Sequence, residues 1–185
     1  MPVTTLDPNT ALLVVDLQNG IVARPLTPRV EAVVTNAAAL IAAFRRRGLP
    51  IVLINVAGAA PGRTEQLRVQ RPAPAGATDF IPELNQQPHD IVVTKHTRGA
   101  FTHTDLEARL RALNVTQVVI AGIATASGVE VTAVQAYELG FNVTLATDAM
   151  TDPRAEAHAY SLANVFPRIG ETGATQEIIG LLGER

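Results

Sequence analysis

Short runs of apolar residues recur along the chain, separated by segments whose apolar positions repeat at helical spacing. Each run has the length of a buried strand and is too short for a typical helix. The alternation of such strands with helices predicts βαβ units and a parallel sheet that is covered on both faces. The predicted strands are 11–15, 51–56, 91–94, 118–121, 143–146 and a short last one near 168–171.

Residues typical of helix termini mark the helices between these strands. Serine or threonine followed three residues later by glutamate forms a capping box, and proline suits the first helical turn. The first long helix is expected to end at Gly48, because glycine often terminates helices. Helix starts are predicted at Thr27 and Pro28, at the capping boxes 104–107 and 127–130, at Asp152 and Pro153, and at Thr175.

These units predict a three-layer α/β/α sandwich of the Rossmann-like type, with a central, mostly parallel sheet of about six strands, because crossovers between parallel strands are right-handed. No repeat or linker divides residues 1–185, so we expect a single domain. Ligands of such sheets bind beyond the carboxyl ends of the strands. The residues that leave those ends are Asp16, Asn55, Lys95, the loop 122–128 and Asp148.

The composition narrows the class of protein. Of the 185 residues, 47% are apolar, and the formal net charge of −2 argues against nucleic acid or an anionic membrane as a partner. The absence of cysteine excludes disulfides, thiolate metal sites and a thiol nucleophile. No apolar run is long enough to span a bilayer, and no signal-peptide pattern opens the chain, so we expect a cytoplasmic protein.

The segment 57–88 is long for a connection in a compact domain, and it contains five prolines. Connections of this kind are often lids or interface arms, and the alternative is a surface excursion without a role in binding. The segment also carries the arginines Arg63, Arg68 and Arg71.

Asp16 and Lys95 are the strongest candidates for chemistry. Lys95 is the single lysine among 15 basic residues, and its compact ammonium is not interchangeable with a guanidinium in a desolvated pocket. Both residues end strands, so they enter one crevice if those strands lie close together. A carboxylate and an ammonium held in contact can relay a proton in a pocket poor in water; a structural ion pair is the alternative.

Three motifs, in order along the chain, resemble those of the isochorismatase-like, or cysteine hydrolase, family. They are Val-Val-Asp-Leu-Gln-Asn at 14–19, Lys95 with Gly-Ala-Phe at 99–101, Thr104 and Leu106, and Gly-Ile-Ala-Thr-Ala-Ser-Gly-Val at 122–129, with the stretch 136–148 continuing the match. The resemblance covers nearly the whole chain. It implies the three-layer fold, a small-molecule substrate and a homo-oligomer, either a dimer or a tetramer.

In the amidases of this family an aspartate, a lysine and a cysteine form the catalytic triad. Asp16 and Lys95 match the first two members, whereas Gly128 stands at the position of the cysteine. This departure removes the evidence for hydrolysis through a covalent thioester. Ser127 lies one residue early, is explained as a helix cap and has no histidine base beside it in the motif, while Thr125 matches the loop-shaping threonine of the family.

A branch of the same superfamily also has glycine at this position and hydrolyses the vinyl ether of isochorismate. That chemistry needs a carboxylic acid and a water, and no nucleophilic side chain. The resemblance implies that Asp16 is the acid, that Lys95 orients it or binds a substrate carboxylate, and that Gly128 leaves room beside a helix N-terminus. Ile-Ala-Thr-Ala at 123–126 replaces the tyrosine-bearing loop of those enzymes, which argues against isochorismate itself as substrate.

Family position also predicts the remaining residues of the site. The substrate-binding residues are expected to be Asn19, Phe101, Ala124, Thr125 and Ser127, and Phe101 is equally suited to the core. Asn-Val-Ala-Gly at 55–58 lacks the metal ligands that nicotinamidases carry after their second strand, and the four histidines show no ligand spacing, so we expect no metal. Glycine motifs for nucleotides are also absent from the sequence, so we expect no cofactor.

The leading interpretation is a cofactor-free hydrolase of a small molecule, with Asp16 as general acid and base, Lys95 as its partner, and vinyl-ether hydrolysis favoured. One alternative is a catalytically inactive family member that binds a small ligand or serves as a subunit. Another alternative keeps amide hydrolysis, through a water activated by Asp16.

Overall fold

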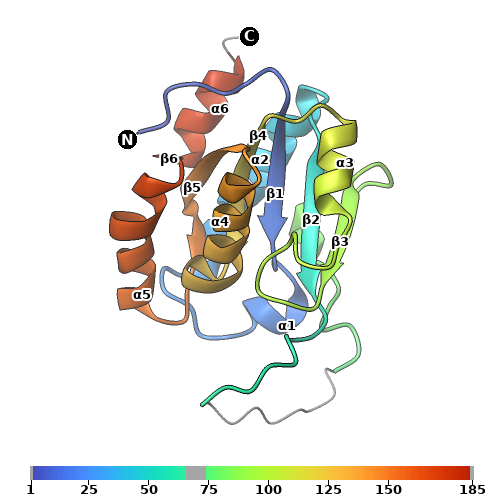
Figure 1. Ribbon diagram of the computed structural model, residues 1–185, viewed down its shortest axis with the longest axis vertical. Helices are drawn as coiled ribbons and strands as arrows, with labels where there is room; N and C mark the ends of the chain where they lie inside the picture. Colours follow the sequence, from blue (N-terminus) through green and yellow to red (C-terminus); the bar gives the residue numbers. More distant parts are fainter. Residues whose placement is uncertain (1, 66–73, 184–185) are drawn as a thin grey trace.

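The computed structural model describes residues 2–65 and 74–183 of the chain. Its strands form one sheet in the order β3-β2-β1-β4-β5-β6, in which every pair of neighbours is parallel (Figure 1). The direction of winding reverses between β1 and β4, which is where doubly wound sheets bind their ligands. The strands are β1 (Thr10–Val15), β2 (Ile51–Val56), β3 (Ile91–Lys95), β4 (Gln117–Ile123), β5 (Asn142–Thr151) and β6 (Glu171–Gly173).

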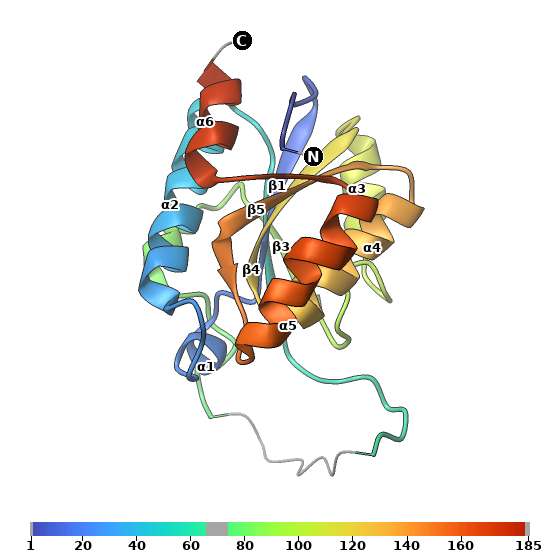
Figure 2. The ribbon, with the colours of Figure 1, turned by 90° about the vertical axis from the view of Figure 1, so that its left-hand side faces the viewer.

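Helices cover both faces of the sheet and complete three layers (Figure 2). α2 and α6 pack on one face, whereas α3, α4 and the segment after α5 pack on the other. The predicted α/β/α sandwich with a parallel sheet is therefore confirmed. The helices are α1 (Asn19–Val22), α2 (Val30–Arg46), α3 (Leu106–Ala112), α4 (Glu130–Glu138), α5 (Ala155–Tyr160) and α6 (Thr175–Gly183), with short helical turns at η1 (Pro82–Leu84), η2 (Thr125–Val129), η3 (Ser161–Val165) and η4 (Phe166–Arg168).

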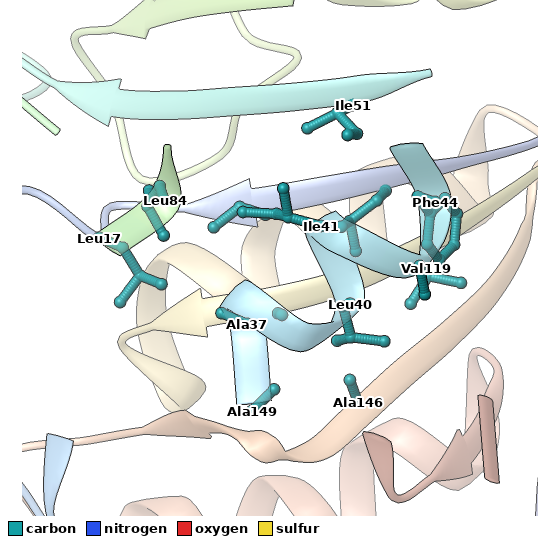
Figure 3. Packing of buried hydrophobic residues seen from close by; sticks show 14 of the residues in the cluster. Leu17, Ala37, Leu40, Ile41, Phe44, Ile51, Leu84, Val119, Ala146 and Ala149 are labelled. Atoms are coloured by element: carbon teal, nitrogen blue, oxygen red, sulfur yellow. The ribbon is translucent and has the colours of Figure 1, made fainter. Parts of the chain in front are cut away.

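The long helix α2 shows how the sequence pattern fixes an element on the sheet. Its buried residues Ala37, Leu40, Ile41 and Phe44 recur every three or four positions and so form one face of the helix. This face belongs to the same buried cluster as Val119 of β4 (Figure 3). Full burial of one large apolar side chain contributes about 1.5–3 kcal/mol, so this face supplies a large stabilising contribution to the packing of α2 on the sheet.

The predicted strands are found, and the last two need correction. β5 continues to Thr151, well beyond the predicted end at 146, through a bulge relative to β4. The bulge contains Thr147 and Asp148, whose polar side chains interrupt the apolar run in the sequence. β6 begins later than predicted, because residues 166–168 still belong to a helical turn.

The helices lie near their predicted positions, but two of the predicted helix starts, at Thr27 and Ser127, make other contacts instead of capping. Thr27 precedes α2 by three residues and instead pairs through its backbone with the end of β5. The Thr104 hydroxyl accepts the Leu106 N–H at 3.4 Å, as expected for a cap of α3, and donates to the Ala100 carbonyl at 2.6 Å. Ser127 lies inside η2 rather than before it, and the Glu130 carboxylate accepts a hydrogen bond from η3 instead of reaching back.

Part of the loop 57–88 is described, and it is tied to the sheet. The buried side chain of Gln18 donates to the Val56 carbonyl, directly before the loop, and to the Ala77 carbonyl within it, at 3.1 Å each. Of the three arginines, Arg63 is exposed, whereas Arg68 and Arg71 lie outside the described residues. Within the described residues, no helix is both long enough and apolar enough to cross a membrane.

Candidate active site

Three strand ends meet at the carboxyl edge of the sheet, the lower edge in Figure 1. Asp16 directly follows β1, Lys95 is the last residue of β3, and η2 follows β4. β2 lies between β1 and β3, yet the long side chain of Lys95 reaches across it and places Nζ 2.8 Å from Asp16 Oδ2. The structure thus brings together the two residues that the sequence singled out.

Asp16 is held in an unusual environment. Its side chain is only 8% exposed, and its backbone adopts a φ of 53°. A left-handed backbone is uncommon for residues other than glycine, and such positions gather at functional sites. Oδ2 accepts the hydrogen bond from Lys95, whereas the buried Oδ1 finds no hydrogen-bond partner among the described residues.

Burial raises the pKa of Asp16 from 3.8 to about 6, because desolvation of the carboxylate outweighs the attraction and the hydrogen bond of the Lys95 ammonium. The carboxyl group therefore exchanges its proton close to neutral pH. A group with this property can donate a proton in one step of a reaction and accept one in another, which makes Asp16 a candidate general acid and base.

Lys95 is buried even more deeply than the carboxylate it contacts. Its side chain is 1% exposed, and its ammonium also donates to the Thr97 carbonyl at 3.3 Å. An ammonium has three N–H donors, of which these contacts use two. Lys95 therefore balances the charge of Asp16 and retains a donor that can meet a ligand.

Two glycines let the chain pass close to this pair. Gly122 in β4 has a φ of 120°, and a Cβ at this position would lie 2.0 Å from the Val15 carbonyl oxygen, so only glycine fits. At Gly128 in η2, a Cβ would lie 3.0 Å from Asp16 Oδ2 and 3.1 Å from the Ile123 carbonyl oxygen. Position 128 thus faces the carboxylate at close range, and a side chain there would crowd it.

A cavity of about 520 Å³ lies over these groups. Among its described lining residues, three are cationic and one is acidic, and most others are apolar or small. In a chain of net charge −2, this lining favours a small anionic ligand with an apolar body. The described ranges contain no group of three His, Cys, Asp or Glu side chains placed to hold a metal ion. The charged lining residues are Asp16, Lys95, Arg24 and Arg98.

The predicted site residues divide into two groups. Those that line the cavity are Asp16, Lys95, Ala124, Ser127 and Gly128. Asn19 is instead exposed, with its amide bound to a carbonyl of the loop 57–88, and Phe101 packs with its ring centroid 6.1 Å from that of Phe141. Thr125 is buried, and its hydroxyl lies 2.8 Å from His158 Nδ1. Asn19, Phe101 and Thr125 therefore lie outside the described lining, and their binding of substrate stays a prediction.

Sequence reasoning missed the side chains that hold η2 in place. The Ala126 N–H donates to Asp152 Oδ2 at 2.9 Å, and His158 contacts the Thr125 hydroxyl. Burial lowers the pKa of His158 and outweighs the opposite effect of the Asp152 carboxylate, which favours a neutral imidazole. The two pairs are separated by 26 and 33 positions in the sequence, so no local motif announces them.

Comparison with known proteins agrees with this geometry. Residues 10–177 match the family model of the isochorismatase domain. The uncharacterized isochorismatase family protein YecD of Escherichia coli O157:H7 is 39% identical to this chain, over 94% of this chain and 96% of YecD. The uncharacterized isochorismatase family protein YwoC of Bacillus subtilis (strain 168) is 38% identical, over 92% of each chain. An isochorismatase family protein from Burkholderia thailandensis has a TM-score of 0.93 at 38% identity, covering 97% of this chain and 98% of that one. The chain belongs to the isochorismatase family of hydrolases.

Proposed function

We propose that this chain hydrolyses a small molecule without a cofactor and without a covalent thiol step, with Asp16 as general acid and base and Lys95 as its partner. The observation that carries this proposal is the state of the Asp16 carboxyl: it is buried at the cavity wall, its Oδ1 is unpartnered among the described residues, and its pKa is raised to about 6. A vinyl ether is the favoured substrate class, because its hydrolysis needs an acid and water but no nucleophilic side chain.

The steps balance with Asp16, water and substrate alone. Protonated Asp16 transfers its proton to the terminal carbon of the C=C bond, whose electron pair forms the new C–H bond. The ether oxygen stabilises the resulting oxocarbenium ion, and ionised Asp16 accepts a proton from the water that adds to it. The hemiketal then releases the alcohol and leaves a ketone, and Asp16 is protonated again.

The neighbouring residues support this role in distinct ways. The Lys95 ammonium keeps the pKa of Asp16 below the value that burial alone would give, so the carboxyl can both lose and regain its proton. Gly128 carries no side chain that would crowd the carboxylate. Arg24 and Arg98 line the cavity and supply positive charge for an anionic group of the substrate.

We also expect the protein to act in the cytoplasm as a homo-oligomer, a dimer or a tetramer. Size-exclusion chromatography with light scattering measures the assembly directly. A monomer at micromolar concentration would contradict this part of the proposal.

The test of function compares two bond classes. Relatives of this chain carry names from both classes: a probable isochorismatase of Pseudomonas chlororaphis is 26% identical, and maleamate amidohydrolase of Pseudomonas putida is 28% identical. Wild type and Asp16→Asn should therefore be assayed with isochorismate and simpler enolpyruvyl ethers, by pyruvate release, and with maleamate and nicotinamide, by ammonia release.

We expect the wild type to cleave an ether and a folded Asp16→Asn variant to lose at least about 10²-fold in rate, the typical contribution of one general acid. Circular dichroism confirms that the variant is folded. Turnover of amides alone would refute the ether assignment. Equal turnover by both proteins, or none by the wild type, would refute the role of Asp16.

A further inference from the structure

Two segments that contribute to the cavity lining are tied to Asp152, a residue that lies outside this lining. Asp152 is 3% exposed, and its Oδ2 accepts the Ala126 N–H of η2 at 2.9 Å. Its backbone carbonyl accepts the N–H of Thr27 at 2.9 Å, in the connection between α1 and α2. That connection contributes Arg24 and Leu26 to the cavity lining, to which η2 contributes Ser127 and Gly128. One buried residue thus links two segments that line the cavity.

The Asp152 carboxylate is itself fixed in rotation. Its Oδ1 accepts the Arg154 N–H at 3.0 Å, so both oxygens are engaged and the side chain cannot turn without breaking two hydrogen bonds. A second contact holds η2 from the same side, where the Thr125 hydroxyl lies 2.8 Å from His158 Nδ1 in α5. η2 is therefore anchored to a rigid support at two adjacent residues.

The position of η2 decides how much space surrounds Asp16. A Cβ on Gly128 would lie only 3.0 Å from Asp16 Oδ2, so a shift of a few tenths of an ångström changes the contact between the turn and the carboxylate. The same shift changes the access of water to a carboxyl whose burial raises its pKa. Misplacing reacting groups by about 1 Å lowers a rate by about 10²-fold.

We propose that Asp152 is a positioning residue, which acts through the Ala126 and Thr27 backbones to set the separation between η2 and Asp16 and so the width of the cavity. Its effect on turnover rests on the function proposed above. Its effect on the Asp16 carboxyl does not, and can be measured without any substrate.

The experiment is a ¹³C NMR titration of the Asp16 carboxyl in the wild type, Asp152→Asn and Asp152→Glu. The matched control is Asp148→Asn: this carboxylate, in β5 four residues before Asp152, accepts two hydrogen bonds from Thr175 at 2.7 Å each but does not line the cavity. Displacing η2 admits water to Asp16, so both Asp152 variants should lower its pKa by about half a unit or more, while the control leaves it in place.

The two variants at position 152 separate geometry from charge. Asp152→Glu keeps the charge and moves the oxygens, so a shift confined to Asp152→Asn reflects lost charge and overturns the proposal, as does no shift in either. If both variants fail to fold, Ala126→Pro removes the N–H that Asp152 accepts without altering any charge, and an unchanged pKa of Asp16 in that variant refutes the proposal.

Turnover provides the readout that a purely structural role would not move. With a substrate identified, we expect folded Asp152 variants to lose at least about tenfold in kcat, whereas Asp148→Asn keeps the wild-type value. Loss of turnover in Asp16→Asn together with full kcat in the Asp152 variants would refute positioning and leave the proposed function intact. Failure of the proposed function would leave the NMR result unaffected.

Discussion

Asp16 should make the folded protein less stable as the pH rises from about 4 to about 7. Burial raises its pKa from 3.8 to about 6, because desolvation outweighs the pairing with Lys95. Below pH 3.8 the carboxyl is mostly protonated in folded and unfolded chains alike. Between pH 3.8 and about pH 6 the unfolded chain loses the proton of Asp16 while the folded chain keeps it. The stability present at low pH is therefore lost progressively as the pH rises through this range, and the loss is complete above about pH 6.

The size of this loss follows from the shift. Each unit of pKa corresponds to about 1.4 kcal/mol, so a rise from 3.8 to about 6 amounts to about 3 kcal/mol. The perturbation is Asp16→Asn, which removes the titrating group and keeps its shape. The assay is urea unfolding at pH 4, 5, 6 and 7, in which subtracting the variant's free energy of unfolding from that of the wild type cancels the other carboxyls.

We expect this difference to fall by about 2 kcal/mol between pH 4 and pH 7, because Asp16 in the unfolded chain is already more than half ionised at pH 4; most of the change lies below pH 6.5. A ¹³C NMR titration of the wild type provides the control, with a midpoint for Asp16 near 6. A difference that stays flat, or that rises with pH, would mean that the Lys95 ammonium compensates the burial in full. It would refute the reasoning that makes Asp16 a proton donor near neutrality.

Three further substitutions test neighbouring parts of the site. Gly122→Ala should lower the free energy of unfolding by at least about 3 kcal/mol in urea, since its Cβ would lie 2.0 Å from the Val15 carbonyl oxygen; a change below about 1 kcal/mol would contradict this contact. Gly128→Ala should reduce turnover at least tenfold with about 1 kcal/mol lost in stability, because its Cβ would crowd Asp16 Oδ2; unchanged turnover would show that the reaction tolerates a side chain beside this carboxylate. Lys95→Met should raise the pKa of Asp16 above 6, measured by NMR, since it removes the one attraction that lowers it; a lower pKa would contradict the pairing.

Much of the carboxyl edge of the sheet was predictable from sequence. Asp16 and Lys95 each end a short apolar run, and parallel strands bring such ends to one edge. Their contact at 2.8 Å was not fixed by that rule, because β2 lies between their strands. It depends on the length of the lysine side chain, for which the rarity of lysine in this chain was the available signal.

The interactions that tertiary structure creates were not predictable. Asp152 was expected as a helix start, yet one of its oxygens serves η2, which lies 26 positions earlier in the sequence. The capping box at Ser127 failed for a related reason, since its Glu130 binds Ser161 at 2.5 Å. Thr125 was expected at the substrate by family position, and the contact of its hydroxyl with His158, 33 positions later, was not announced by any local pattern. Local patterns single out a polar residue, but its hydrogen-bond partner depends on which distant segments the fold brings beside it.

The ion pair of Asp16 and Lys95 is difficult to explain as a device for stability. Removing two charges from water costs several kcal/mol for each, and a well-packed apolar pair of similar size is often as stable or more so. The raised pKa of Asp16 indicates that Lys95 does not offset this penalty in full, and Asp16 Oδ1 gains no hydrogen bond within the described residues. Both residues of this costly pair line the cavity, and Asp16 faces Gly128, which carries no thiol. This arrangement suits a reaction that needs a proton donor and no nucleophilic side chain.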